Sequence, residues 1–394
     1  MDVPSTPVRD EIRRTVQAVM KKFGDDYWLD KDQKHEYPWE FYAEFAKAGL
    51  LGIVIPEEYG GAGLGITEAA IALYEVAASG AGMNGASSVH LSIFGINPVV
   101  KHGSAEMKAK YLPALVKGDL HVCFGVTEPD AGTDTTRITT FAKRDGDNYI
   151  INGRKTWITK AGESTKILLL ARTTPLEECA RRTDGMTLFF ADLDPKAVTI
   201  RPIAKMGRHA VPSNDVFIDN LVVPASDVVG EVGRGFYNLL DGLNPERILG
   251  AAGGLGAGRA ALSRATAYAK DRKVFGRAIG MNQGIQFPLA DSHVRLMAAE
   301  QLIAKAAELY DTGQPCGAEA NAAKFLAGEA AFQAADRAVQ TLGGYGYAAE
   351  FVVERLFRET RLVRIAPISE NLILAHIAEH VLGLPRSYGR SDNS

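Results

Sequence analysis

The sequence predicts a mixed α and β protein, with an N-terminal helical domain, a middle β-barrel or β-sandwich domain and a C-terminal antiparallel helical bundle. From residue 7 to about residue 120, apolar residues recur at the three- and four-residue spacing of amphipathic helices. Between about 122 and 235 this spacing gives way to short apolar and β-branched runs. The helical spacing returns after Gly235 and lasts almost to the end of the chain. We therefore expect domains at residues 1–121, 122–235 and 236–394.

The composition supports a globular protein and excludes several functional classes. The chain has 394 residues, of which 46% are hydrophobic and 23% are charged, and domains average ~150 residues. The net charge of −3, from 44 basic and 47 acidic side chains, provides no field that would attract nucleic acid. No apolar run approaches the ~18 residues of a membrane span, and the N-terminal stretch lacks a signal-peptide core. We expect a cytoplasmic protein without membrane insertion.

The cysteines and the familiar catalytic motifs narrow the chemistry further. Cys123, Cys179 and Cys316 lie far apart, so they offer neither a disulfide framework nor a CxxC metal pair. The sequence contains no HExxH, P-loop or GxSxG motif. The glycines at 344–346 follow a helical stretch instead of a strand, which argues against a Rossmann fingerprint. We expect catalysis that uses neither a metal nor a thiol.

In the N-terminal domain, the first helix is predicted by Val8, Ile12, Val16 and Val19. A second helix should follow Pro38, because proline is favourable at the first helical position. The segment PEEYGGAGLG cannot form a helix interior and is expected to be an ordered loop. Helical spacing then resumes at residues 66–78 and 98–116.

The middle domain should contain six strands, since six short runs are rich in apolar and β-branched residues. Turn residues separate them at 145–148 and 152–153. Six strands in so short a segment favour a sandwich or barrel over βαβ units. The expected strands are residues 121–126, 149–151, 167–171, 187–192, 198–203 and 214–218.

The C-terminal domain should be a bundle of long helices joined by short connections. The predicted helical stretches are residues 238–270, 281–311, 318–342 and 369–382. The small residues at 253–258 are typical of close helix packing. By itself, Glu246 next to Pro245 is typical of a carboxylate at the positive end of a helix, worth ~0.5 kcal/mol.

Several segments, taken in order, resemble the acyl-CoA dehydrogenase family of flavoproteins over nearly the whole chain. The resemblance implies the helix–β–helix fold of that family and oxidation of an acyl-CoA thioester to a trans-2-enoyl-CoA, with hydride transfer to flavin N5. The segments that carry it are PEEYGGAG, FGVTEPDAGTD, INGRKTWIT, KMG with VFIDNLVVP, LNPERILGA, DRKVFG with Gln283, and QTLGGYGY.

The resemblance further implies a noncovalent FAD and assigns its contacts by position. Phe124, Val126, Thr127 and Thr133 match the loop at the flavin ring, and Thr133 also matches a contact to CoA. Trp157 would wall the ring, with Ile158 beside it and the Thr159 hydroxyl near flavin N5. The residues that match contacts to the FAD pyrophosphate and adenosine, usually supplied by a neighbouring subunit, are Arg272, Phe275, Gln283, Gln340, Gly343 and Gly344. Near the C-terminus, Ser369 and Asn371 match positions that approach FAD. Substrate contacts would come from Tyr237, Asn244 and Arg247.

The position of the catalytic base departs from the usual family pattern. Most members carry a glutamate before the last long helix, where this chain has Ala366 and Pro367, neither of which can accept a proton. Isovaleryl-CoA and long-chain acyl-CoA dehydrogenases instead carry it in a segment that Leu243-Asn244-Pro245-Glu246-Arg247 reproduces. The resemblance therefore implies Glu246 as the base, with Glu370 as the alternative. Proline also lacks the backbone N–H that polarises the thioester carbonyl in the family, so either the register shifts by one residue or the carbonyl is held differently.

The leading hypothesis is an FAD-dependent acyl-CoA dehydrogenase that forms a homotetramer, or a dimer, and passes electrons to an electron-transfer flavoprotein. Two alternatives stay open. The altered segment at 366–368 favours a relative with redox-neutral or oxidase chemistry. A noncatalytic scaffold relative would not need Glu246, Arg247 and the FAD positions, all of which are present.

Overall fold

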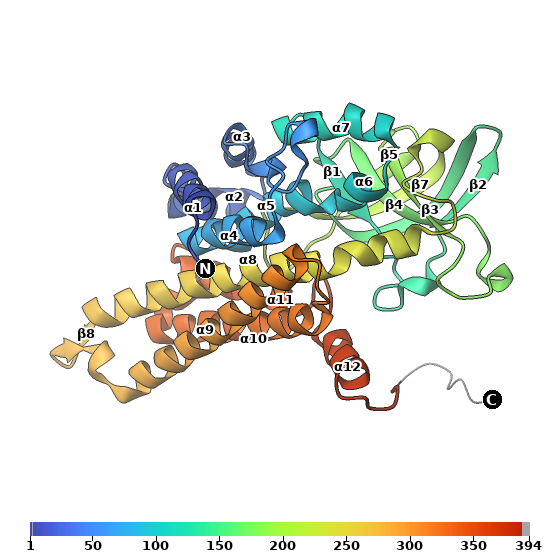
Figure 1. Cartoon of the computed structure of the whole chain (residues 1–394). Helices are drawn as coiled ribbons and strands as arrows, with labels where there is room; N and C mark the ends of the chain where they lie inside the picture. Colours follow the sequence, from blue (N-terminus) through green and yellow to red (C-terminus); the bar gives the residue numbers. More distant parts are fainter. Residues whose placement is uncertain (2, 388–394) are drawn as a thin grey trace.

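The computed structural model describes Met1 and residues 3–387, and it has helices at both ends of the chain and a β-sheet between them (Figure 1). The first helical segment and the sheet lie next to each other, and the long helix α8 (Gly235–Asp271) runs beneath both. The predicted division into helical, β-rich and helical parts is confirmed. Within the described part of the chain, no helix is both long and apolar enough to cross a membrane.

The N-terminal segment packs its helices around a core that includes Trp28, Phe41 and Phe45. The predicted continuous helix at 98–116 is wrong, because it breaks at Gly103 and restarts where the Ser104 hydroxyl accepts a hydrogen bond from Met107 N–H (3.1 Å). The helices are α1 (Pro7–Met20), α2 (Asp25–Lys34), α3 (Trp39–Lys47), α4 (Ile66–Val76), α5 (Gly82–His90), α6 (Asn97–His102) and α7 (Ala105–Lys117). Short π-helical turns, η3 (Ala77–Ala81) and η4 (Leu91–Gly95), flank α5.

The middle segment forms one seven-stranded sheet with the order β1-β4-β2-β3-β7-β6, in which β5 pairs with the other edge of β4. The predicted turn at 145–148 joins β2 to β3. The predicted turn at 152–153 is wrong, since both residues lie inside β3 at an irregularity in its pairing with β7. The strands are β1 (Val122–Gly125), β2 (Phe141–Asp145), β3 (Asn148–Thr159), β4 (Lys166–Arg172), β5 (Met186–Asp192), β6 (Val198–Pro202) and β7 (Ser213–Pro224).

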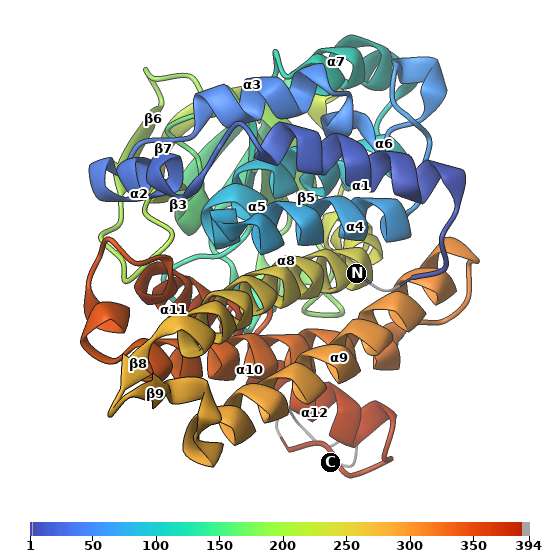
Figure 2. The same ribbon diagram turned by 90° about the vertical axis from the view of Figure 1, so that its left-hand side faces the viewer.

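The C-terminal segment is an antiparallel bundle built around α8 (Figure 2). The small residues of α8 allow close packing, as predicted: a Cβ on Gly256 would lie 2.5 Å from the Tyr74 carbonyl oxygen. The bundle contains α9 (Gln283–Asp311), α10 (Gly317–Leu342), α11 (Val352–Val363) and α12 (Glu370–His380), and a hairpin of β8 (Lys273–Val274) and β9 (Arg277–Ala278) joins α8 to α9. Single turns complete the fold: η1 (Leu50–Gly52), η2 (Glu57–Tyr59), η5 (Thr135–Arg137), η6 (Leu176–Glu178), η7 (Ala225–Asp227), η8 (Ile279–Met281) and η9 (Gly343–Tyr347).

Candidate active site

A buried ion pair holds the loop that follows β1. The Lys155 ammonium lies 2.8 Å from Glu128 Oε1 and also donates to the Val126 carbonyl (3.0 Å). The Glu128 carboxylate accepts from the backbone N–H groups of Thr139 (2.6 Å) and Thr140 (3.0 Å). Burial opposes ionisation of Glu128, but the Lys155 charge and these hydrogen bonds outweigh it and hold its pKa at about 2. The loop is therefore fixed against β3.

The end of β3 presents an exposed aromatic ring beside this loop. Thr156 N–H donates to the Thr127 carbonyl (2.9 Å), which holds strand and loop side by side. Trp157 has a left-handed backbone (φ 60°) and a side chain that is 57% exposed, whereas Ile158 is buried. An exposed tryptophan on a left-handed backbone is rare, and its ring suits stacking against a planar ligand.

Glu246 lies in the interior of α8, which corrects the expectation that it begins a helix. The helix starts at Gly235 and continues through Pro245, so Glu246 lies about three turns from the N-terminus and beyond the reach of the helix dipole. Its side chain is only partly accessible. Burial raises the pKa of Glu246 to about 7, against the opposing charges of Arg247 and Lys324. A carboxyl group with this pKa can exchange protons near neutral pH.

The segment where most family members carry their base lies across α8, one turn beyond Glu246. A Cβ on Gly250 would be 3.5 Å from Pro367 Cδ and 3.7 Å from Lys324 Cε. Because residues four apart lie on the same helix face, Glu246 and Gly250 point toward the same neighbours. The buried Lys324 ammonium donates to the Val363 carbonyl, which ties α10 to the end of α11.

Glu370, the alternative base, is engaged in a two-point ion pair. Arg364 donates from Nε to one carboxylate oxygen (2.7 Å) and from Nη2 to the other (2.8 Å). The neighbouring Ser369 caps α12 by accepting a hydrogen bond from Leu372 N–H (3.4 Å). Asn371 is exposed at the start of the same helix.

The predicted substrate contacts lie along the first turns of α8. Arg247 donates to Asn244 Oδ1 (2.8 Å), while its buried Nε has no partner within the described residues. The Tyr237 hydroxyl contacts Thr183 Oγ1 (2.9 Å) and Asp184 Oδ1 (3.0 Å), which joins α8 to the connection between β4 and β5. An unpartnered guanidinium nitrogen beside Glu246 suits a polar or anionic part of a substrate.

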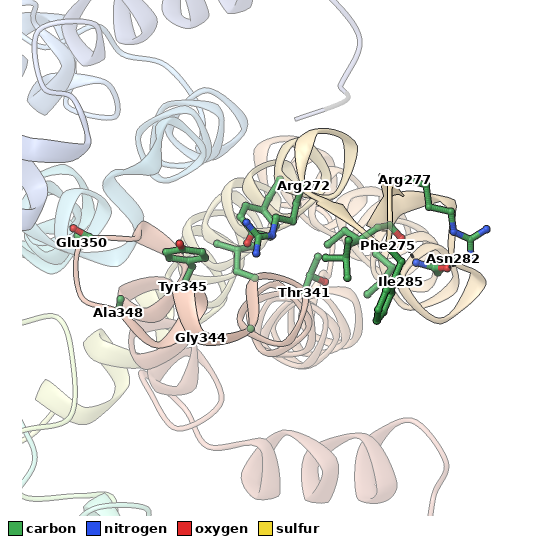
Figure 3. A pocket seen from close by; sticks show the side chains of 15 residues that line it. Arg272, Phe275, Arg277, Asn282, Ile285, Thr341, Gly344, Tyr345, Ala348 and Glu350 are labelled. Atoms are coloured by element: carbon green, nitrogen blue, oxygen red, sulfur yellow. Dashed lines mark hydrogen bonds between the residues drawn. The ribbon is translucent and has the colours of Figure 1, made fainter.

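A cavity of about 860 Å³ lies at the opposite end of α8, beside the β8–β9 hairpin (Figure 3). Arg272, Phe275, Gly343 and Gly344 line it, and Phe275 is fully exposed. A Cβ on either glycine would meet no atom within 4 Å, so a ligand could approach the backbone closely. The predicted residues Gln283 and Gln340 lie just outside this lining, at the ends of α9 and α10.

The predicted site residues therefore fall into separate groups within one chain. The loop residues 126–127 lie beside the end of β3, and Phe124 precedes them in β1, whereas Thr133 lies exposed further along the loop. The cavity group is at the other end of the molecule from the sheet, as Figure 1 shows by the place of β8. Sequence reasoning missed the Lys155–Glu128 pair and Lys324. The alanine-rich stretch around Lys324 in α10 is a signal of a buried lysine with a partner, whereas β3 carries several polar residues and gives no such signal.

Comparisons with known proteins agree along most of the chain. Residues 6–119, 123–221 and 233–382 match the models described as the N-terminal, middle and C-terminal domains of acyl-CoA dehydrogenase. The acyl-CoA dehydrogenase FadE12 of Mycobacterium tuberculosis is 39% identical over 96% of this chain and 97% of its own. The chain belongs to the acyl-CoA dehydrogenase family. It is thus a flavoprotein oxidoreductase with the three-part fold of that family.

Two solved structures of this acyl-CoA dehydrogenase fold illustrate the likeness. Butyryl-CoA dehydrogenase from Megasphaera elsdenii is 30% identical, with a TM-score of 0.91, and the match covers 97% of this chain and 100% of that one. A structure of the electron transferring flavoprotein of Acidaminococcus fermentans contains a chain that is 29% identical, with a TM-score of 0.92 and the same coverage. Among the residues that the structure describes, no cluster of three or more potential ligands could hold a metal ion.

Proposed function

We propose that this protein is an FAD-dependent acyl-CoA dehydrogenase in which Glu246 removes the α-proton of the substrate. The observation that carries the proposal is the half-buried carboxyl group of Glu246, with a pKa of about 7, on the face of α8 that meets Pro367. A general base works best when its pKa is near the working pH. Glu370 is less suited to the role, because both of its oxygens already accept hydrogen bonds from Arg364.

The chain's residues fit the two ends of FAD. The exposed Trp157 ring suits the planar flavin, with Ile158 and Thr159 beside it and Val126 and Thr127 on the fixed loop. At the cavity beside the β8–β9 hairpin, the open backbone of Gly343 and Gly344 and the Arg272 guanidinium suit a pyrophosphate. When bound, FAD would supply the hydride acceptor at its N5 atom.

The reaction then follows from where the two hydrogens go. The Glu246 carboxylate takes the α-proton while the β-hydrogen leaves as hydride, so an acyl-CoA becomes a trans-2-enoyl-CoA. Arg247 and Asn244, which are hydrogen-bonded to each other on α8, would bind the CoA portion together with Tyr237 and Thr133. An acyl chain packed against Glu246 would exclude water from the carboxylate and make it more basic once the substrate is bound.

The thioester carbonyl needs a hydrogen-bond donor other than the one usual in the family. Pro367 has no N–H, and Ala366 N–H donates to the Leu362 carbonyl (2.9 Å). Neither register of the segment therefore offers a free N–H at that position. This departure favours, as a second candidate, an FAD-containing relative that runs a redox-neutral elimination or an oxidase reaction.

We further propose that the FAD site is completed between subunits of a homotetramer or a dimer. Two observations support it: the Trp157 ring does not line the Arg272 cavity, which lies beside the β8–β9 hairpin, and α9 exposes Phe287, Val294 and Met297. A closed assembly could bury these apolar side chains and bring one chain's cavity to another chain's sheet. The electron acceptor would be an electron-transfer flavoprotein.

An anaerobic panel of acyl-CoA esters tests the proposal. The panel covers chains from C4 to C16 together with branched and cyclic acyl groups, and flavin bleaching and enoyl-CoA formation are followed together. We expect bleaching with a stoichiometric enoyl product for at least one member. Product formation without net bleaching would indicate the redox-neutral candidate. Rapid reoxidation of the reduced flavin by oxygen would indicate an oxidase. Colourless protein would indicate the scaffold relative.

A further inference from the structure

Arg208 is a buried cation next to the end of β3. It lies in the connection between β6 and β7, is 9% exposed and has a left-handed backbone (φ 58°). Lys205 donates to the carbonyl groups of Gly207 and Arg208, which fixes the connection in this conformation. Burial lowers the pKa of Arg208 to about 10, so it stays charged at neutral pH. A buried charge is costly unless something compensates it.

The Glu359 carboxylate offsets part of this cost through its charge, but the hydrogen-bond partners of Arg208 are neutral hydroxyl groups. Within residues 1 and 3–387, Nη2 donates to Ser213 Oγ (3.0 Å) and Thr159 Oγ1 (3.4 Å), and no salt bridge forms. Its buried Nε has no acceptor in the described part of the chain. Burial and the charge of Arg208 lower the pKa of His90 to about 4, so this neighbour is neutral at neutral pH. Arg208 is thus a positive charge directed at the hydroxyl groups at the end of the sheet.

The hydrogen bond from Arg208 determines on which side the Thr159 hydroxyl accepts and on which side it can donate. A hydroxyl has one proton to donate and two lone pairs to accept with. Because the guanidinium can only donate, Thr159 Oγ1 accepts on that side and its own proton points elsewhere. Trp157, two residues earlier, carries the exposed ring of the proposed flavin site. The threonine proton is then free to meet an acceptor at the edge of the bound ring.

We propose that Arg208 is a positioning residue that directs the Thr159 hydroxyl proton toward flavin N5 and thereby makes the flavin a stronger hydride acceptor. This inference rests on the proposed FAD site. A hydrogen bond to N5, backed by a fixed positive charge in a desolvated site, favours the addition of electrons to the ring.

The test compares four variants of the FAD-loaded protein: Arg208→Met, Arg208→Lys, Thr159→Val and the double variant Arg208→Met/Thr159→Val. The midpoint potential of the flavin is measured against a reference dye, together with its visible spectrum and with kcat and KM for the best substrate of the panel. We expect Arg208→Met to lower the equilibrium constant for flavin reduction by about tenfold or more, with kcat reduced and KM retained. Arg208→Lys should recover part of both.

The double variant identifies the route of the effect. If Arg208 acts through the hydroxyl, Arg208→Met changes the potential much less in the Thr159→Val background than in the wild type. Additive effects, or a wild-type potential in yellow Arg208→Met protein, would overturn the inference. A loss of activity confined to acyl groups that bear a terminal carboxylate would also overturn it, because Arg208 would then bind the substrate.

Folding defects and absence of flavin have distinct outcomes. If Arg208→Met does not fold, Arg208→Lys and Thr159→Val carry the test, and unchanged potentials in both overturn the inference. Wild-type protein that binds no FAD overturns the proposed function and this inference together. Yellow, active protein whose potential ignores position 208 overturns only the inference.

Discussion

Glu246 owes its properties to burial in the interior of a helix, which the sequence alone did not reveal. Pro245 suggested a helix start, whereas the helical spacing predicted a stretch from residue 238; α8 begins at Gly235, in agreement with the spacing. The dipole argument therefore no longer applies, and desolvation sets the pKa. The identity of the residue could be predicted from the motif, whereas its electrostatic environment depends on residues distant in sequence, such as Lys324.

Replacing Glu246 should stop the reaction without emptying the site. Glu246→Gln keeps the size and hydrogen bonding of the side chain but removes its basicity. We expect it to retain FAD and acyl-CoA binding and to slow flavin reduction on the order of 10³-fold or more in stopped-flow measurements. The matched control, Glu370→Gln, should stay within several-fold of the wild type. A dead Glu370→Gln with an active Glu246→Gln would reverse the assignment.

The pKa of about 7 for Glu246 predicts how rate and stability depend on pH. Only the carboxylate accepts a proton, so kcat/KM of the free enzyme should rise with pH through about 7 and then level off. Stability changes in the opposite sense. Because the folded pKa exceeds the unfolded value, the folded state binds the extra proton, and this contribution is lost as pH rises through about 7. In Glu246→Gln that component of the pH dependence of the unfolding free energy should disappear; an unchanged profile would contradict the assignment.

Arg247 should act in binding more than in chemistry. It follows Glu246 directly, so it projects about 100° around the helix from the proposed base. Arg247→Lys keeps the charge but loses the planar fork of donors. We expect steady-state assays to show a larger rise in KM than fall in kcat, because the contact is common to the ground and transition states. A fall in kcat with KM unchanged would instead place Arg247 in the chemical step.

At the scale of elements, the long helices and the apolar strands could be predicted, and the mixed-polarity elements could not. Strand β2 has the sequence FAKRD, in which Ala142 is the one buried residue, so it lacks an apolar run. Helix α11 was missed because Arg355 and Glu359 occupy its buried face as an ion pair (2.7 Å), which interrupts the apolar spacing. Both elements are held by partners from elsewhere in the chain, and local spacing carries no information about those partners.

The Lys155–Glu128 pair should couple the loop after β1 to the stability of the sheet. Lys155→Met leaves a buried carboxylate without its cation, which typically costs about 3–5 kcal/mol. We expect a lower unfolding temperature and weaker FAD retention, measured by calorimetry and by the flavin content after gel filtration. The double variant Lys155→Met/Glu128→Leu removes both charges and should recover most of the stability but not the FAD content. Equal stability of the single and double variants would contradict the coupling.

At the scale of the whole molecule, local sequence reasoning says least about where the Trp157 and Arg272 groups of proposed FAD residues lie relative to each other. A motif identifies candidate residues but does not show whether they meet within one chain or only between two chains. The Arg272 cavity lies beside the hairpin, whereas Trp157 lies near the end of β3 and does not line that cavity, so the proposed FAD site would draw on two separate groups of residues. Cofactor binding and assembly should therefore depend on each other.

Arg272→Ala tests that dependence. The variant should lose FAD, assembly and stability together, because FAD binds only the folded, assembled state and thereby stabilises it. If the Kd for FAD lies about 100-fold below the working concentration of FAD, the linked loss of folding free energy is ~3 kcal/mol. The wild type should purify yellow as a homotetramer or dimer, checked by light scattering and absorbance. Lys143→Ala, on the exposed side of β2, is the control and should change neither. A monomer with full FAD occupancy, or a colourless variant as stable and as assembled as the wild type, would show that the two halves of the site do not meet across subunits.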